Sequence, residues 1–432
     1  MTKPLSFCVM GIAAFGLCAA PQAAADEVAD FYKNTRMTMV VGAAPGGGYD
    51  LYSRLIVRHM VKHIPGAPGM IAQNMPGAAS IRAANYAYAV AKQDGSVIVA
   101  LNRTAAFAQI FGQKGPKFDA VKFQWLGSLN NEAGILRVRV DSGVKTIADA
   151  RRKAVILGAT APGADTSNYP ALLNNTLGTK FRLVFGYPSG PAIDLAIERG
   201  EVQGQTDSIS SMLARWPKWR EQFNLPAQLS LTRHPDLHDV PLILDFVKAG
   251  NLAPGVDAKE AETFWRIMLV QQVMGRPFAL GPRVPAARVK ALRTAFQKMV
   301  ADNDFLADAK RQKRAVSPTG GDEVQKMITE VASAPKATIA KLSDALKFRG
   351  KMEKAKISYI KDTGPVVATA KGGRVITIQK DGKKLKARVS GRSTKVTIGG
   401  KKAKRSAIKT GMTCTLVYPA PGQQAKEVNC KM

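Results

Sequence analysis

The stretch best suited to chemistry is the glycine-rich segment 42–50, GAAPGGGYD, which follows an apolar run at 39–41. Apolar residues then recur at helical spacing from Leu51 onward, so we expect a strand, a loop and a helix. Glycines let a ligand approach the backbone closely, and the free amides at the start of a helix attract negative charge. The loop therefore suits an anion, although a turn of this kind can also be glycine-rich for steric reasons alone. Asp50 is expected at the N-cap or in the first helical turn.

Other kinds of site are excluded by the motifs that are missing. The loop lacks the G-x-x-x-x-G-K-[ST] spacing of a phosphate loop and the G-x-G-x-x-G spacing of a dinucleotide fold. The chain also lacks G-x-S-x-G and H-E-x-x-H, which argues against a secreted hydrolase. Its four histidines form two loose pairs, His59 with His63 and His234 with His238, and no third metal ligand accompanies them. We therefore expect no enzyme activity, no cofactor and no metal ion.

Two series of alternating strands and helices must position such loops. The first series covers residues 37–125 and predicts a mainly parallel sheet covered by helices. The second begins near residue 135 and contains further loops of small residues. The expected strands are 38–42, 70–74, 96–101, 135–140, 154–158, 182–185, 203–206 and 229–231. The expected helices are 51–63, 80–91, 169–177, 192–199, 261–274, 286–302 and 321–334.

The two series predict two α/β lobes that the chain crosses between twice. We expect lobe one to comprise residues 26–134 and 232–348, and lobe two to comprise residues 135–231, with a linker at 349–356. Ligands bind outside the carboxyl ends of the strands in open α/β sheets. The small-residue loops of both lobes should therefore face a common cleft.

The N-terminus has the pattern of a secretory signal peptide, residues 1–25. Lys3 precedes an apolar run at 7–20, and the alanines at 23–25 precede Asp26 as a cleavage site. This run is too short for a membrane span, and no later run approaches the roughly 18 apolar residues that a span requires. We expect a protein exported to the periplasm.

The C-terminal stretch differs from the rest in charge and in pattern. The net charge of the chain is +31, and residues 351–432 alone carry 20 Lys and Arg against 4 Asp and Glu. Alternating runs broken by glycines predict a small all-β module at 357–432, with a barrel as one form. Cys414 and Cys430 are the only cysteines after the expected cleavage, which predicts a disulfide. The lysines form either a charged exterior that blocks edge pairing or a surface that attaches to an anionic polymer or membrane.

Several motifs in register resemble the Bug-type receptors of tripartite tricarboxylate transporters. They are GAAPGGGYD (42–50), QNMPGA (73–78), AKQDG (91–95), GYPSGPA (186–192) and ERGEV (198–202), within a resemblance that covers about residues 36–345. The resemblance implies a two-lobed periplasmic-binding-protein fold of type II-like architecture. It also implies a small carboxylate ligand, held largely by backbone amides and waters at the loops after the first strands.

Carried over residue by residue, this resemblance gives the candidate ligand-binding positions. In lobe one they are Ala44, Pro45, Gly46, Gly47, Gly48, Asp50, Pro76, Gly77, Ala78 and Ser80. In lobe two they are Pro162, Gly163, Ala164, Asp165, Thr166, Tyr187, Ser189 and Asp207. Arg54, Arg103 and Arg137 could add a charged clamp, but we expect them to be solvated.

The sequence thus favours an extracytoplasmic solute-binding receptor that captures a small carboxylate between its lobes and delivers it to inner-membrane permease subunits. A secreted hydrolase and an envelope-polymer-binding protein are the alternatives. The basic tail lacks the interleaved aromatic residues of a nucleic-acid binder, since Tyr359 and Tyr418 are its only aromatics. Backbone amides bind the carboxylate group and give no information on the rest of the ligand. The sequence therefore does not identify the ligand. The site should be complete before Ala345 and independent of the tail.

Overall fold

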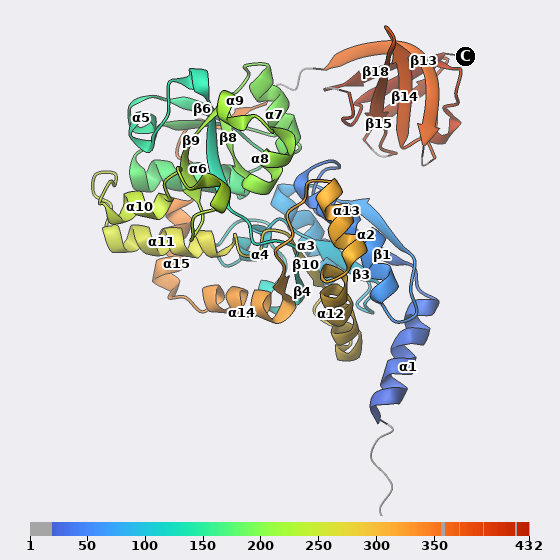
Figure 1. Cartoon of the computed structure of the whole chain (residues 1–432), viewed down its shortest axis with the longest axis horizontal. Helices are drawn as coiled ribbons and strands as arrows, with labels where there is room; N and C mark the ends of the chain where they lie inside the picture. Colours follow the sequence, from blue (N-terminus) through green and yellow to red (C-terminus); the bar gives the residue numbers. More distant parts are fainter. Residues whose placement is uncertain (1–19, 356–358, 371, 392, 420, 432) are drawn as a thin grey trace, which may run out of the picture.

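In the computed structural model the chain forms two α/β lobes and a separate module of strands (Figure 1). The expected α/β fold with a C-terminal all-β module is confirmed. The structure describes residues 20–355, 359–370, 372–391, 393–419 and 421–431. Most of the expected signal peptide lies outside these residues, and helix α1 (Ala20–Lys33) runs across its expected end. None of the described helices has the length and apolar character needed to cross a membrane.

Lobe one is built on a six-stranded sheet with helices on both sides (Figure 1). Its strand order is β11-β4-β10-β3-β1-β2, with bounds β1 Met37–Val41, β2 Met70–Asn74, β3 Val97–Ala100, β4 Gln124–Ser128, β10 Pro277–Leu280 and β11 Thr319–Gly320. Its helices are α2 Gly48–His59, α3 Ile81–Ala89, α4 Ala105–Ala108, α12 Ala286–Val300, α13 Asn303–Arg311 and α14 Gly321–Ala332. Short 3-10 turns lie at Met60–His63, Ala78–Ser80 and Ala120–Lys122.

Lobe two has a second six-stranded sheet, in the order β12-β7-β6-β8-β5-β9. The strands are β5 Gly134–Arg139, β6 Val155–Ala159, β7 Phe181–Phe185, β8 Gly204–Ser208, β9 Phe223–Leu229 and β12 Glu353–Lys354. The helices around it are α5 Ile147–Arg152, α6 Asp165–Leu177, α7 Gly190–Glu198, α8 Ile209–Arg215, α9 Trp219–Gln222, α10 Ile243–Lys248, α11 Ala258–Val270 and α15 Lys336–Ala345. Strand β12 joins this sheet from within the stretch expected to be a linker.

The strands expected at 38–42, 70–74 and 96–101 pair in parallel, as predicted, but each sheet as a whole mixes parallel and antiparallel strands. In lobe one β1 pairs in parallel with β2 and β3, but β10 is antiparallel to both β3 and β4. In lobe two β6 is parallel to β7 and β8, while β5 is antiparallel to β8 and β9. The antiparallel pairs arise where the chain crosses between the lobes and returns, which local periodicity does not reveal.

Strand β9 and helix α6 begin well before their expected starts, and each contains a proline. The returning strand expected at 229–231 is β9, Phe223–Leu229, which contains Pro226. Strand β9 lies at the edge of its sheet, where a missing amide donor is tolerated. Helix α6 begins at Asp165 and not at Tyr169, with Pro170 in its second turn. As a result Asp165 and Thr166 belong to a helix and not to a loop.

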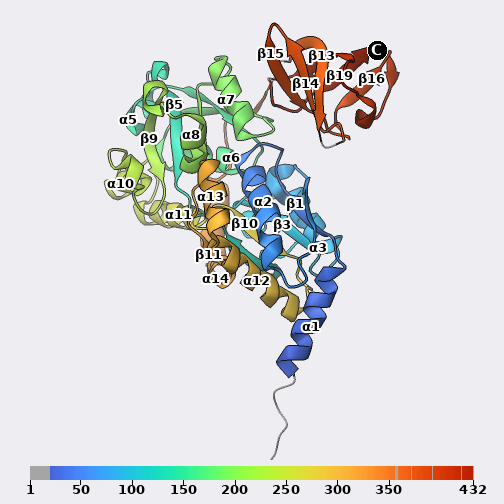
Figure 2. The same ribbon diagram turned by 45° about the vertical axis from the view of Figure 1, so that its right-hand side comes forward.

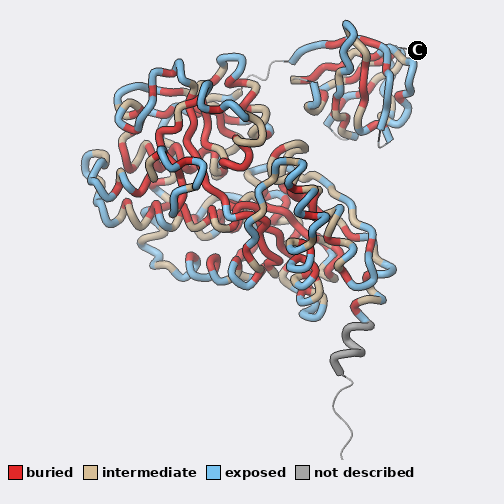
Figure 3. The backbone as a smooth tube through the Cα atoms, viewed as in Figure 1, coloured by how far each residue is buried: buried red, intermediate tan, exposed pale blue. Residues whose placement is uncertain are grey.

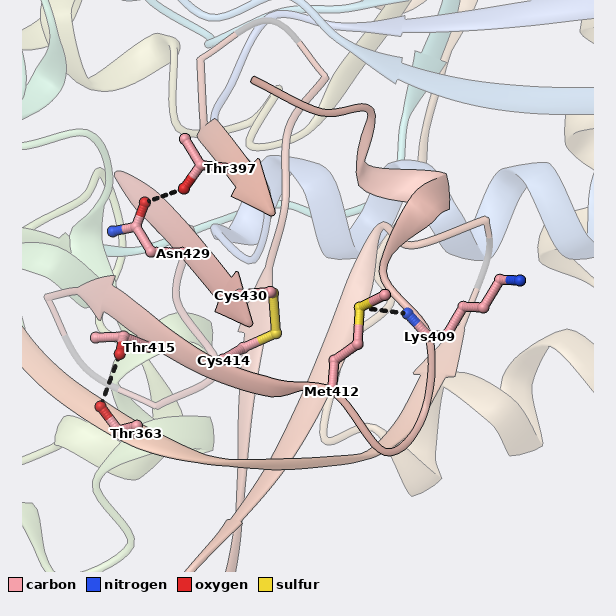
Figure 4. Close-up of a disulfide and its surroundings, with 8 residues drawn as sticks. All are labelled: Thr363, Thr397, Lys409, Met412, Cys414, Thr415, Asn429 and Cys430. Atoms are coloured by element: carbon pink, nitrogen blue, oxygen red, sulfur yellow. Dashed lines mark hydrogen bonds between the residues drawn. A yellow bond between two sulfur atoms is a disulfide. The ribbon is translucent and has the colours of Figure 1, made fainter. Parts of the chain in front are cut away.

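The C-terminal module is a single seven-stranded sheet in the order β15-β14-β13-β18-β19-β16-β17. Its strands are β13 Ile360–Ala370, β14 Val375–Lys380, β15 Lys383–Arg388, β16 Lys395–Ile398, β17 Lys401–Lys402, β18 Thr413–Tyr418 and β19 Glu427–Lys431, with a 3-10 turn at Arg405–Ala407. The expected disulfide between Cys414 and Cys430 is confirmed, and it joins directly opposed residues of β18 and β19 (Figure 4). The bond lies in the buried interior of the module, which has its own apolar core.

The apolar core of the two lobes is shared, unlike that of the module. One buried cluster runs from Phe107 and Trp125 of lobe one to Leu157 and Trp265 beside lobe two, and Figure 3 shows buried chain continuing between the lobes. The Trp265 indole Nε1 donates a hydrogen bond to Thr176 Oγ1 at 3.1 Å. Helix α11 therefore packs against α6 of lobe two, although it lies in the stretch 232–348 that we expected in lobe one.

Candidate functional site

The glycine loop joins β1 to α2, as the sequence indicates. Asp50 is the third residue of α2, whose N-cap is Gly47, so it lies in the first turn. Its carboxylate is fully buried and accepts hydrogen bonds from the Gly46 amide at 2.8 Å and from Asn74 Nδ2 at 2.8 Å. Arg54 adds two more, from Nε and Nη2. Asp50 therefore holds the loop in shape from inside lobe one.

The three glycines have different roles in this loop. Gly46 has a φ of +86°, a left-handed conformation that a side chain disfavours. Gly47 is extended, and a Cβ added there would lie 3.7 Å from Ser189 Cβ of lobe two. A Cβ added to Gly48 would lie 3.1 Å from Ser211 Oγ, also in lobe two. Ala44 and Pro45 complete the loop, half-buried. The missing side chain of Gly48 thus lets lobe two approach the start of α2, whereas a Cβ on Gly47 would make ordinary contacts.

The second loop of lobe one combines exposed small residues with an unusual backbone. Pro76, Gly77 and Ala78 are exposed. Gly77, Ala78, Ala79 and Ser80 all have positive φ, from +45° to +144°. Such a run stores strain that the surrounding structure must hold in place. Ser80 supplies part of that hold, because its buried hydroxyl donates to the Gly42 carbonyl at 2.8 Å and accepts from the Asn102 amide at 2.9 Å.

The loop before α6 brings lobe two against lobe one. Asp165 forms an ion pair with Arg103 of lobe one at 2.7 Å, and Arg103 Nη1 also donates to Ser208 Oγ at 3.3 Å. Gly163 is packed so closely that a Cβ on it would lie 2.3 Å from Gln113 Oε1 of lobe one. Pro162 is exposed, and Ala164 is the buried N-cap.

Two arginines are not where the sequence reading puts them. Arg103 is 1% exposed and Arg137 is fully buried, so the expectation that both are solvated is wrong. Arg137 pairs with Asp194 and lies 3.3 Å from Asp207. Asp207 also accepts from Arg215 Nη2 at 2.5 Å. The carboxylate of Asp207, a candidate ligand residue, is thus engaged by two arginines of its own lobe.

A second buried ion pair at the lobe boundary was missed by sequence reasoning. Arg276, next to β10, lies 3.1 Å from Glu132, which follows β4. The Arg276 guanidinium donates to Ser210 and Ser211 of α8 and lies 4.9 Å from the ring centre of Tyr49. The serines that follow β8 are the one local signal that could have indicated this cluster.

The tyrosines near the boundary stay protonated at neutral pH. Burial raises the pKa of Tyr49, and the charge of Arg103 only partly opposes this. Burial and the neighbouring Glu201 carboxylate raise the pKa of Tyr187 to about 12. Tyr187 is buried, as is Ser189, and Thr166 Oγ1 accepts a hydrogen bond from the Thr160 amide. Three of the candidate positions of lobe two, Thr166, Tyr187 and Ser189, are therefore buried polar groups.

The boundary between the lobes is closed around these groups in this structure. Surface cavities of about 520 and 560 Å³ lie elsewhere, lined by residues such as Phe111 and Ser343, and Tyr88 and Arg293, respectively. Neither is lined by a residue of the glycine loop. Within the described ranges, no three His, Cys, Asp or Glu side chains gather as a metal ion would require. The lobe boundary is thus a polar, arginine-rich contact between small-residue loops.

No protein-family model matches the sequence, and no curated protein matches it either. Among solved structures, the chain is similar to the periplasmic binding protein BugD, at 17% identity and a TM-score of 0.56, covering 74% of this chain and 99% of that one. It is also similar to an adipate-bound protein of R. palustris, at 18% identity and a TM-score of 0.54, covering 72% and 98%.

Malate-bound MatC of Rhodopseudomonas palustris gives 20% identity and a TM-score of 0.52, covering 73% of this chain and all of that one. BugD bears the name of the receptor class that the motifs resemble, so the expected likeness is confirmed at the level of fold. About a quarter of this chain lies outside each likeness. The chain therefore has the two-lobed fold of tricarboxylate-type periplasmic binding proteins, to which a basic β module is added.

Proposed function

We propose that this protein is an extracytoplasmic receptor for a small carboxylate, which binds where the glycine loop meets lobe two. The observation that carries the proposal is the meeting of Gly47 and Gly48 with Ser189 and Ser211 at the N-terminal end of α2. The free amides and the positive end of the helix dipole favour an anion at this point. The solved structures with bound malate and adipate have the same fold, which supports a carboxylate as the ligand.

The charges around this point fit an anion. Arg103 and Arg276 both lie near Tyr49 at the lobe boundary, and both are buried. Each is already balanced by a carboxylate, Asp165 or Glu132. Their role in the proposal is to fix the polar walls, while backbone amides hold the ligand. Entry requires the lobes to separate, because the loops are in contact.

The proposed ligand site comprises the candidate positions of both lobes. Asp50, Ser80 and Asp207 act as positioning residues in it, because their side chains are engaged within their own lobes. Delivery to inner-membrane permease subunits and a periplasmic location are parts of the same proposal. The structures that share the fold are binding proteins, which favours a receptor over the alternative of a secreted hydrolase.

The test is calorimetric titration of the parent chain and of Gly47→Val with mono-, di- and tricarboxylates. Gly47 is extended, so valine needs no strained backbone, but its methyl groups would enter the space between the loop and Ser189. Gly69→Val is the matched control, because Gly69 has no heavy atom within 4 Å of an added Cβ. We expect Gly47→Val to lose at least about 100-fold in affinity, or about 2.7 kcal/mol. Equal affinities in the two variants would overturn the proposed site.

A second function, attachment to an anionic envelope polymer or membrane surface, is favoured by the module. Lysines 383, 384, 401 and 402 are exposed on β15 and β17, in a stretch with few carboxylates. Changing all four to Gln should weaken retention of the full chain on a heparin column, with elution at lower salt. Elution at the same salt concentration as the parent would contradict attachment. The lysines would then serve only to block pairing at the sheet edges.

A further inference from the structure

The C-terminal module contacts both lobes beside the glycine loop. Upstream of the module, β12 pairs with β7 of lobe two, and the Ala355 amide donates to the Phe185 carbonyl at 2.7 Å. Arg199, which follows α7 of lobe two, donates to the Pro419 carbonyl of the module. In both views the module lies next to α7 and α2 (Figures 1 and 2). The module is therefore not a free appendage of the lobes.

The contact with lobe one is made by Arg388, the last residue of β15. A Cβ built on Gly46 would lie 3.0 Å from Arg388 Nη1 and 3.4 Å from Nη2, so the guanidinium lies against the backbone of the glycine loop. The same Nη1 is 4.0 Å from Asp50 Oδ2. Two-fifths of the side chain is exposed, at 38%. Arg388 thus presents a positive charge at the edge of the proposed anion site.

The backbone of Arg388 is fixed by hydrogen bonds and strand pairing, which restricts the position of its guanidinium. Its amide donates to the Gln423 carbonyl at 2.9 Å, and its carbonyl accepts from the Ala425 amide at 2.8 Å. On the other side it is paired with Val375 of β14. Both edges of the residue are therefore fixed within the module, and the guanidinium projects from a rigid base.

Asp50 does not accept a hydrogen bond from the guanidinium of Arg388. The Asp50 carboxylate already has partners in Gly46, Arg54 and Asn74, and at 4.0 Å Arg388 is beyond hydrogen-bond distance. Within the part of the chain that the structure describes, Asp50 provides the only carboxylate oxygen within 4.0 Å of Arg388. A planar guanidinium with free donors is suited to binding a second carboxylate with two parallel hydrogen bonds.

We propose that Arg388 completes the ligand site from outside the two lobes and selects dicarboxylates by pairing with the carboxylate that the glycine loop does not hold. This rests on the proposed receptor function. It replaces the expectation that the site is complete before Ala345. The module then acts as a third wall of the site, held to lobe two through Arg199 and reaching lobe one through Arg388.

The test compares Arg388→Gln with Lys395→Gln, which removes the same charge from an exposed position on β16. Each full-length variant is titrated with adipate and with hexanoate, six-carbon acids that differ by one carboxylate. We expect Arg388→Gln to weaken adipate binding about 10- to 100-fold, the range for a lost charge-assisted hydrogen-bond pair, and to change hexanoate binding less than about twofold. Lys395→Gln should match the parent for both acids.

The outcomes separate this inference from the function on which it rests. If the parent binds neither acid nor any other carboxylate, the receptor proposal and this one both fall. If the parent binds adipate and Arg388→Gln binds it equally well or more tightly, only the role of Arg388 falls, and tighter binding would show a residue that obstructs the site. An equal loss for adipate and hexanoate would also overturn the inference, because it would mean general attraction and not recognition of the second carboxylate.

Discussion

The two-lobed body and the C-terminal module carry their positive charges in opposite ways. In the body, Arg103, Arg137 and Arg276 are at most 2% exposed, and each is paired with a carboxylate. In the module the lysines lie on the surface, and among the described residues Lys380 with Asp362 is the ion pair formed within it. Three buried arginines of the body hold its own segments together, whereas the lysines of the module remain available to other molecules.

The difference also shows in how each part is held together. The body has a continuous apolar core across both lobes, while the module has a small core of its own with a disulfide at its centre. A small domain buries too little apolar surface to be stable by that alone, so a covalent link compensates. The following changes, from the largest expected effect to the smallest, test whether charge and stability are divided in this way.

The largest effect is expected from Glu132→Gln, which leaves Arg276 buried without its counter-charge. Losing one partner of a buried pair costs about 3–5 kcal/mol of unfolding free energy. Differential scanning calorimetry should show a lower melting temperature for the body. The double variant Glu132→Leu/Arg276→Met is the control, because it removes both charges and should recover much of the loss. A single variant as stable as the parent would contradict the structural role of this pair.

The next effect concerns the disulfide, through the double variant Cys414→Ala/Cys430→Ala. Closing a loop of this length stabilises a fold by about 3 kcal/mol in the chain-entropy estimate. Only the module should loosen, because the body has a separate core. Hydrogen exchange should rise in residues 359–431 and stay unchanged in β1 and β6. An equal rise in the body would show that the two parts fold as one unit.

A smaller effect is expected from Asp50→Ala, at about 2 kcal/mol of unfolding free energy. The Gly46 amide and the side chains of Arg54 and Asn74 would lose a buried acceptor. This exceeds the roughly 1 kcal/mol of a simple helix cap. Urea unfolding provides the measurement, with Asp50→Asn as the variant that retains one acceptor oxygen. Ligand affinity should fall along with stability, since Asp50 shapes the loop.

The smallest effect is the pH dependence that Asp362 gives to the stability of the module. The hydrogen bond from Lys380, followed by that from Tyr418, lowers the pKa of Asp362. A depressed pKa in the folded state gives stability that is present above the unfolded value, about 3.9, and is lost as the pH falls below it. The melting temperature of the module should therefore drop below about pH 4, and Asp362→Asn should flatten that slope. A slope that persists in the variant would assign it to another group.

Local sequence pattern was sufficient to predict the strands and helices that are bounded by clear turn residues. The expected bounds of β2 match the structure because its run ends at turn residues. The disulfide followed from the count of cysteines, and the two series of alternating strands and helices led to the two lobes. The glycine loop could be predicted because a run of glycines is typical of a tight turn, and Gly46 indeed has a positive φ. The helix could be predicted from the apolar spacing that follows the loop. Strand β9 was misplaced because Pro226 looks like a terminator unless the strand is known to lie at an edge.

Tertiary structure alone decided which charges are buried and which parts meet. Arg103 and its partner Asp165 are 62 residues apart, and Arg137 and Asp194 are 57 apart. No local pattern marks an arginine as buried, because its environment is set by strands from distant parts of the chain. The same holds for Arg388, one of many basic residues in the tail until the module places it against Gly46. Sequence thus determined the backbone that can receive an anion, and the packing of distant segments determined which side chains surround it.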